Sequence, residues 1–240
     1  MKVLLNDPPR ERVEGNAEFV SLEELKEQAD IISLHVPLNK GGLDNTEHLV
    51  NREFLTHLKS GAILINTSRG AVVDEAALLE GISSGKLSDV ILDVFETEPI
   101  INQELLDDLT LATPHIAGYS LDGKANGTTM SVRAISRFFK LGLDDWSPAS
   151  MPVPKISELL ADASESNLYE LLWEVYNQSY DVSSDDQRLR AAPDSFEILR
   201  GEYPFRREPV AYAVRLFQGY PEIRKVLEGL GFDVLSDQCM

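Results

Sequence analysis

The sequence is poor in cysteine and in long apolar runs, and each shortage excludes a class of protein. The single cysteine, Cys239, stands next to the last of 240 residues. Neither a disulfide nor a cysteine-rich metal cluster can therefore form within one chain, and the reducing cytoplasm is the expected location. No apolar run approaches the roughly 20 residues that a membrane-spanning helix requires. The opening residues, MKVLLNDPPR, turn polar too soon for a signal peptide.

Positive charge is also scarce. The chain has 22 lysines and arginines against 40 aspartates and glutamates, which gives a formal net charge of -18. Proteins that bind nucleic acids concentrate lysine and arginine, so we expect no nucleic-acid partner. The 43% hydrophobic content suits one or two globular domains with real cores. A small-molecule substrate or another protein is the expected partner, and we predict no metal site.

What the sequence does contain is an alternation of apolar strands and helices. Strands are predicted over 2–6, 31–36, 62–66, 89–92 and 109–112, with helices over 21–29, 51–58 and 74–83 between them. This alternation predicts βαβ units around a parallel sheet. The predicted fold class is α/β, with a doubly wound, Rossmann-like parallel sheet. Such sheets bind ligands beyond the carboxyl ends of their strands.

The pattern changes after residue 120. A long helix is predicted over 121–143, with an apolar stripe that indicates packing. Residues 144–155, DDWSPASMPVPK, contain three prolines and two serines and are predicted to form a linker. Beyond them, helices over 168–176, 194–203 and 221–230 and strands over 210–217 and 232–235 predict a small α/β C-terminal domain.

Two charged residues follow the ends of predicted strands. Asp7 ends the first strand, where a carboxylate can accept both ribose hydroxyls of a dinucleotide. The alternative is a turn-forming aspartate before proline. Arg69 stands between the buried strand 62–66 and Gly70. Its planar fork suits a carboxylate or a keto acid, and the alternative is a surface ion pair.

Glu98 and His115 follow two further strands. Glu98 lies in LDVFETEP, for which a solvated acidic loop is the alternative, and His115 lies in ATPHIAGYS, for which a structural histidine is the alternative. Histidine transfers protons near neutral pH. Reducing a keto acid needs a cation for the substrate, a proton donor and a carboxylate behind that donor. Arg69, His115 and Glu98 match these three roles. The other histidines are interpreted as structural: His35, His48 and His57.

These motifs resemble those of the D-isomer-specific 2-hydroxyacid dehydrogenases, through LINTSRGAVVDEAAL, LDVFETEP and TPHIAGYS, and the resemblance covers residues 2 to about 143. It implies that Arg69 binds the substrate, that His115 donates the proton and that Glu98 supports the histidine. It also implies NAD as the cofactor. The implied NAD contacts are Asp7, Thr67, Ser68, Asp93 and Gly118, and the implied substrate contact is Tyr119.

A narrower resemblance is carried by LLNDPPR, HIAGYSLDGKANGTT and the tail YDVSSDDQRLR to FEILRGEYPFRRE. It is to family members that oxidise 4-phospho-D-erythronate, a small phosphorylated hydroxy acid, in pyridoxine biosynthesis. The tail resembles their extra C-terminal dimerisation domain, which implies a homodimer. The alternatives are a dehydrogenase for another D-2-hydroxy acid, or a dimerising protein without catalysis. Arg206 and Arg207 are candidates for the substrate phosphate, and a solvated pair beside Glu208 is the alternative.

The family's glycine-rich phosphate loop precedes the strand that ends at Asp7, and this chain begins at that strand. We therefore expect an N-terminally truncated protein that binds NAD weakly or not at all. GLGFDV, at 229–234, does not replace the loop, because it lacks the third glycine and precedes a strand. The expected domains are a partial NAD-binding domain lacking its first βα unit (1–118), a returning helix of the substrate (lid) domain (119–143), a linker (144–155) and a dimerisation domain (156–240).

Overall fold

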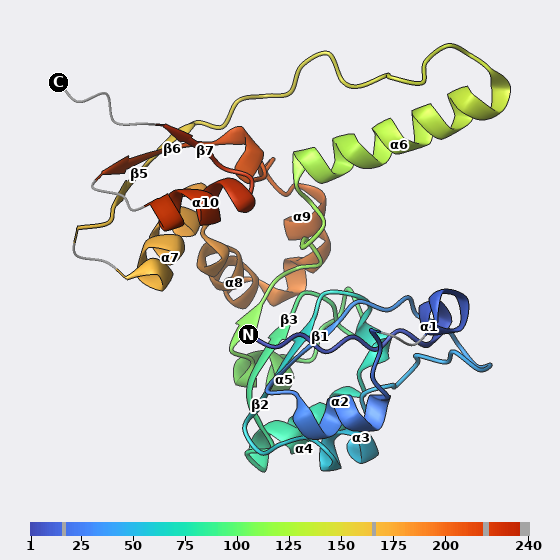
Figure 1. The fold of residues 1–240 in the computed structure, drawn as a ribbon. Helices are drawn as coiled ribbons and strands as arrows, with labels where there is room; N and C mark the ends of the chain where they lie inside the picture. Colours follow the sequence, from blue (N-terminus) through green and yellow to red (C-terminus); the bar gives the residue numbers. More distant parts are fainter. Residues whose placement is uncertain (16–17, 165–166, 218–220, 236–240) are drawn as a thin grey trace. The chain divides into compact units, whose positions relative to one another are not determined.

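The chain folds into two compact units (Figure 1). The computed structural model describes all residues except 16–17, 165–166, 218–220 and 236–240, so Cys239 lies outside the described residues. The first unit comprises Met1–Ile116 and Ser183–Glu202, and the second comprises Ala117–Val182 and Tyr203–Met240. Among the described helices, none combines the length and the apolar character needed to cross a bilayer.

The first unit is built on a four-stranded parallel sheet with the order β1-β2-β3-β4. The strands are β1 (Ile31–Leu34), β2 (Ala62–Asn66), β3 (Leu87–Leu92) and β4 (Leu111–Ala112). Across the sheet, Leu34 pairs with Asn66, Asn66 with Leu92, and Leu92 with Ala112. The strands therefore end side by side at one carboxyl edge. The predicted α/β class with a Rossmann-like parallel sheet is confirmed.

The helices between these strands begin at polar caps. They are α1 (Pro8–Glu14), α2 (Leu22–Gln28), α3 (Arg52–Thr56), α4 (Glu75–Ser83) and α5 (Gln103–Asp108). Each preceding side chain accepts a hydrogen bond from an N–H of the first turn: Asp7, Ser21, Asn51, Asp74 and Asn102. Such caps contribute about 1 kcal/mol each. They fix where each helix begins, and α4 packs directly on β3.

Residues 183–202 also belong to the first compact unit, although the predicted dimerisation domain, 156–240, includes them. They include most of α8 (Val182–Ala191), a 3-10 turn η2 (Pro193–Ser195) and α9 (Phe196–Gly201). Leu189 and Phe196 are buried in the core of this unit, and the Phe196 ring meets the Phe95 ring edge-on at 6.0 Å. These contacts join residues far apart in the chain, so the local pattern could not reveal them. The helix predicted over 194–203 begins later, at Phe196, and Asp194 lies in η2.

Residues 2–6 do not form the predicted strand. Only Leu5 pairs, in a single parallel bridge to Phe19. A parallel ladder needs a partner strand along its length, and in the described part of the chain β1 pairs with β2 alone. Val3 and Ile31 are accordingly exposed, at 72% and 47%.

The second unit contains a long helix and a small parallel sheet. Helix α6 (Leu121–Phe139) ends short of the predicted residue 143, because Lys140 adopts a left-handed φ of 57°. The sheet has the order β5-β6-β7, from Glu158–Asp162, Ala213–Phe217 and Asp233–Leu235. Strand β6 begins later than predicted, because Pro209–Ala211 forms a 3-10 turn, η3.

Among the described residues, helices cover one face of the sheet in the second unit. Helix α7 (Leu168–Ser179) contacts β5 and α10 (Pro221–Gly229) contacts β7, and both lie on the same side of the sheet in Figure 1. Leu159 and Val214 are fully buried on this face. Alternate residues point the other way, and there Leu160 is 53% exposed. Parallel sheets are usually covered on both faces, so the open face stands out.

Candidate active site

The turn after β2 presents Arg69. Asn66, the last residue of β2, is fully buried, and its Oδ1 accepts bonds from the Ser68 N–H at 3.0 Å and the Ser68 hydroxyl at 2.8 Å. Its Nδ2 donates to the Arg69 carbonyl at 3.0 Å. The Arg69 side chain is exposed, and one of its nitrogens, Nη1, donates to the Ser68 carbonyl at 2.6 Å. Within the described residues no carboxylate forms an ion pair with it, so the guanidinium is available to a ligand.

This turn packs directly on the loop after β3. A Cβ built on Gly70 would lie 1.9 Å from the Phe95 carbonyl oxygen, so only glycine permits the contact. The Glu96 N–H donates to Oε1 of Glu75 at 2.8 Å, which ties the same loop to the start of α4. Burial raises the pKa of the Glu75 carboxyl. Arg69 and the loop that carries Glu98 are therefore held against one another through their backbones.

Glu98 and His115 are in contact, although they follow different strands. Nδ1 of His115 donates to Oε2 of Glu98 at 2.8 Å, and the two side chains are 24% and 19% exposed. The other carboxylate oxygen of Glu98 accepts the Phe95 N–H at 2.8 Å. This bond fixes the carboxylate, which in turn orients the imidazole and leaves Nε2 for a substrate. The arrangement suits proton transfer at the carboxyl edge of the sheet.

Asp93 organises the loop that carries His115. Its Oδ1 accepts the Thr113 hydroxyl at 2.6 Å and the Ile116 N–H at 2.7 Å, and the residue is only 2% exposed. Its carbonyl accepts the His115 N–H at 2.7 Å, which helps to hold His115 at a φ of 56°. This positioning role was not among the predictions from the sequence, and neither was that of Asn66. The common signal is a polar residue at or just after the end of a buried strand.

A second histidine–glutamate pair lies at the same loops. Nε2 of His48 donates to Oε1 of Glu96 at 2.7 Å, and the His48 N–H donates to the Ala71 carbonyl at 2.8 Å. The hydrogen bond to Glu96 raises the pKa of His48. The pair joins residues far apart in the chain, and no local motif in the sequence signals it. His35 and His57 bond only to near neighbours, Ser33 and the Glu53 carbonyl.

The remaining predicted site residues lie in different surroundings. Asp7 caps α1 by accepting the Arg10 N–H at 3.0 Å, the turn-forming role that the sequence left open. Thr67 is half-buried between Asn66 and Ser68. Gly118 and Tyr119 belong to the second unit, where Nζ of Lys124 lies 4.0 Å from the centroid of the Tyr119 ring. Their contacts with a cofactor or a substrate stay predictions.

The described part of the first unit offers NAD only part of a site. A dinucleotide's pyrophosphate needs free N–H groups at the start of a helix, usually after a glycine-rich loop. Here the first turns of α1 to α5 each give an N–H to a capping side chain, and two of those caps, Asp7 and Asp74, carry negative charge. The described residues therefore do not fit the pyrophosphate.

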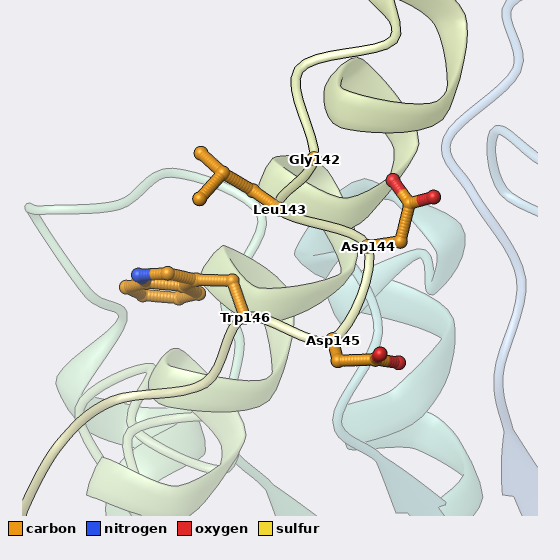
Figure 2. A pocket seen from close by; sticks show the side chains of 5 residues that line it. All are labelled: Gly142, Leu143, Asp144, Asp145 and Trp146. Carbon is orange, nitrogen blue, oxygen red and sulfur yellow. The ribbon is translucent and has the colours of Figure 1, made fainter.

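A hollow in the second unit does not compete as an active site. It is lined by Gly142, Leu143, Asp144, Asp145 and Trp146, with Leu143 and Trp146 pointing to one side of the loop and the two aspartates to the other (Figure 2). Asp144 accepts the Ser136 hydroxyl at 2.6 Å. The lining comes from one continuous loop folded back on α6, and it brings together no nucleophile, base and cation.

The chain is similar in sequence to known proteins. Residues 1–117 match the family described as D-isomer specific 2-hydroxyacid dehydrogenase, NAD binding domain, and residues 150–231 match a domain of unknown function. The erythronate-4-phosphate dehydrogenase of Bacteroides thetaiotaomicron is 47% identical over 214 residues, 89% of this chain and 59% of the relative. That of Proteus mirabilis is 41% identical over 236 residues, 97% of this chain and 62% of the relative.

A solved structure is also similar. The D-lactate dehydrogenase of Aquifex aeolicus, crystallised with NAD and lactic acid, is 34% identical and covers 63% of this chain and 51% of its own, with a TM-score of 0.47. The chain spans about three fifths of the length of the curated relatives it matches, 59% and 62% for the two named above. Residues 1–117, just under half of the 240, therefore match the NAD-binding domain of the D-isomer specific 2-hydroxyacid dehydrogenases.

Proposed function

We propose that this chain carries the substrate-oxidising residues of an NAD-dependent erythronate-4-phosphate dehydrogenase, which converts 4-phospho-D-erythronate to its 2-oxo acid in pyridoxine biosynthesis in the cytoplasm. The observation that carries the proposal is the Glu98–His115 pair at the same sheet edge as the unpaired Arg69. The identity of 40–47% to proteins of that name supports the choice of substrate.

The chemistry needs three actions from these side chains. Arg69 binds the substrate carboxylate with its planar fork and orients the carbon that carries the hydroxyl. Nε2 of His115 accepts the hydroxyl proton as the carbonyl forms. Glu98 stabilises the resulting imidazolium and keeps the ring in one tautomer. NAD supplies the acceptor for the hydride when it is bound.

The test joins the chain to the part of a relative that it does not match. We would join the part of the Bacteroides thetaiotaomicron relative that this chain does not match to the chain, in the relative's own order, and assay NADH formation. We expect the chimera to oxidise 4-phospho-D-erythronate in preference to D-lactate or unphosphorylated D-erythronate. His115→Gln should lower kcat by about 10²–10⁴-fold, whereas the matched control His57→Gln should not. Faster oxidation of another D-2-hydroxy acid would replace the proposed substrate.

NAD binding by the chain alone is a separate expectation. Because the pyrophosphate site is not provided, we expect NADH fluorescence to change little on titration with the 240-residue chain. The chimera should enhance the fluorescence saturably. Tight binding to the chain alone would show that another part of the molecule binds the pyrophosphate.

A second proposal is that the chain forms a homodimer through the open face of the β5–β7 sheet. Leu160 and Phe217 are 53% and 38% exposed there, and the Arg215–Glu158 ion pair joins neighbouring strands. In a dimer with two-fold symmetry the same face of both copies meets, which would bury these side chains in each copy. Dimerisation does not depend on catalysis, so this proposal also applies if the protein dimerises but is catalytically inactive.

Analytical ultracentrifugation of the whole chain tests the dimer. Leu160→Glu should shift the protein to monomer, while the exposed Leu43→Glu in the first unit should not. The isolated segment 150–240 is a poor reagent, because Leu189 and Phe196 would lose the core that buries them. A wild-type chain that remains monomeric at high concentration would contradict the proposal.

A further inference from the structure

The strand that leads to His115 is held by a helix that comes much later in the chain. Asp186 of α8 accepts the Ala112 N–H of β4 at 2.7 Å, across 74 positions. On its other side β4 pairs with β3, and just beyond β4 the Thr113 N–H donates to the Leu92 carbonyl at 2.9 Å. The backbone that runs into His115 is therefore fixed both by the sheet and by α8.

Asp186 is itself held in place. Nε of Arg190 donates to Oδ2 of Asp186 at 2.8 Å, and the two side chains are 29% and 15% exposed. Arg190 also donates to the carbonyls of Leu106, within α5, and, at 2.9 Å, of Leu109, just after it. Leu189, next to Arg190 in α8, is fully buried in the core of the first unit. Helix α8 is therefore anchored on α5, on β4 and in the core.

The same segment also reaches the loop that carries Glu98. The Phe196 side chain, 1% exposed, meets the Phe95 ring edge-on at 6.0 Å, an arrangement that aromatic rings favour. The Phe95 N–H donates to Oε1 of Glu98 at 2.8 Å, and Oε2 of Glu98 accepts from His115. A shift of Phe95 would therefore turn the carboxylate away from the imidazole.

We propose that residues 183–202 position the Glu98–His115 pair, with Asp186 and Phe196 as the positioning residues. Asp186 acts through β4 on His115, and Phe196 acts through its neighbour ring on Glu98. The segment lies within the matched domain of unknown function, 150–231, whereas the pair lies within the matched NAD-binding domain, 1–117. Its importance for catalysis rests on the proposed function, but the orientation of the ring does not.

The test is the tautomer of the His115 ring in the whole 240-residue chain, without cofactor or turnover. We would label the histidine rings with ¹⁵N and measure by NMR, at alkaline pH, the ratio of the Nδ1–H form to the Nε2–H form. His115→Gln assigns the signal. Wild type should favour Nδ1–H, because Glu98 accepts that proton. Asp186→Ala and Phe196→Leu should each lower the ratio about fivefold, as expected for a weakened hydrogen bond.

Three further variants calibrate this ratio. Glu98→Ala should give the value for a ring that has lost its carboxylate. Asp186→Asn keeps an oxygen for the Ala112 N–H, so it should retain most of the wild-type ratio. Leu58→Ala removes a buried side chain from the same core, so it should destabilise the unit without changing the ratio.

Several results would overturn the proposal. A wild-type ring that carries its proton on Nε2 would remove the pair on which it rests. An unchanged ratio in folded Asp186→Ala or Phe196→Leu would remove the role of that residue. An equal loss in Leu58→Ala would assign the effect to general destabilisation. If the first two variants do not fold, Arg190→Gln, which removes the group that orients Asp186, and Phe196→Met take their places.

The outcome is separable from the dehydrogenase proposal. In an active chimera, Asp186→Ala and Phe196→Leu should lower kcat about 10–100-fold and change KM little, since Arg69 still binds the substrate. If the chimera is inactive but the tautomer ratio falls in both variants, the positioning stands and the proposed function fails. If the chimera is active and both variants keep the wild-type kcat, the function stands and the positioning role in catalysis fails.

Discussion

Two arginines, Arg69 in the first unit and Arg207 in the second, have the same side chain in opposite situations. Arg69 is exposed, and its turn is shaped by the amide of Asn66 and by the contact of Gly70 with the next loop. Arg207 is 10% exposed and bound by Asp122, itself 6% exposed, through a bidentate ion pair. Neutral groups position Arg69, so its charge remains available to a ligand. The charge of Arg207 instead stabilises the fold through its ion pair with Asp122.

This difference explains why position in the sequence is a poor guide to whether an arginine binds a ligand. Both arginines stand in segments that resemble functional motifs, and both were candidates for binding substrate. Availability depends on whether a carboxylate elsewhere in the chain has already paired with the guanidinium. For Arg207 that carboxylate is 85 positions away. The comparison therefore makes opposite predictions for stability and for ligand binding at the two sites.

The largest expected effect is on stability, and it should separate the two arginines. Arg207→Ala leaves Asp122 buried without its partner, so we expect a loss of about 3–5 kcal/mol in the free energy of unfolding. Arg69→Ala should change it by no more than about 0.5 kcal/mol. Urea unfolding followed by circular dichroism measures both. Fluorescence of Trp146 and Trp173, both in the second unit, identifies the transition that Arg207 affects.

Lowering the pH should weaken the Asp122–Arg207 pair and so reduce its contribution to the free energy of unfolding. Burial acts to raise the pKa of Asp122, but the bonds from Arg207 and from the Glu208 N–H outweigh it, and the net pKa is lowered. A carboxylate with a lowered pKa stabilises the fold above its unfolded pKa of about 3.9, and this contribution is lost as pH falls through the folded value. Asp122→Asn should remove that dependence. An Arg207→Ala protein as stable as wild type would contradict the role of the pair.

A smaller effect should come from the backbone contact that holds the Arg69 turn. Gly70→Ala places a Cβ against the Phe95 carbonyl, so we expect a loss of about 1–3 kcal/mol in the free energy of unfolding. The matched control is Gly127→Ala in α6, where a Cβ meets nothing within 4 Å and alanine should stabilise by about 0.5–1 kcal/mol. Equal effects of the two substitutions would show that the turn can move away from Phe95.

The smallest effect should come from His48. Its N–H donates to the Ala71 carbonyl, just after the Arg69 turn, and its ring bonds Glu96. Its side chain is 43% exposed, so we expect His48→Gln to cost only about 0.2–1 kcal/mol. Because Glu96 raises the pKa of His48, the pair stabilises fully below the unfolded pKa of about 6.5 and loses its effect as pH rises through the folded value. NMR titration of His48 should show a raised midpoint that Glu96→Gln abolishes. An unchanged midpoint in Glu96→Gln would assign the shift to another group.

Local pattern predicted the elements that depend on nearby residues. The strand 62–66 matches β2, and the helices predicted over 51–58 and 74–83 match α3 and α4, which Asn51 and Asp74 cap. The order of Arg69, Glu98 and His115 after successive parallel strands predicted that all three lie at one sheet edge. These inferences succeeded because strand periodicity, capping and parallel topology are properties of short segments.

The misses share a different physical origin. The packing of Phe196 on Phe95, the pairing of Arg207 with Asp122 and the pairing of His48 with Glu96 each join residues far apart in the chain. Residues 2–6 look like a strand but form only the Leu5 bridge, because a strand also depends on the neighbour it pairs with. Asp93 follows β3 as predicted, but the sequence suggested only a contact with NAD for it. Its hydrogen bonds to Thr113 and Ile116 form only when the chain brings the loop after β4 against the end of β3.

The sequence by itself determined the α/β class, the parallel sheet and the kinds of side chain that the loops present, because each follows from the local alternation of apolar and polar residues. The tertiary structure alone decided which of those charges meet. Glu98, after β3, hydrogen-bonds His115, after the neighbouring strand β4, and Asp122 pairs with Arg207. Arg69, Lys124 and Arg206 form no ion pair with a carboxylate in the described part of the chain. The reason is that the energy of a charge depends on distances and burial, which the order of residues along the chain does not specify.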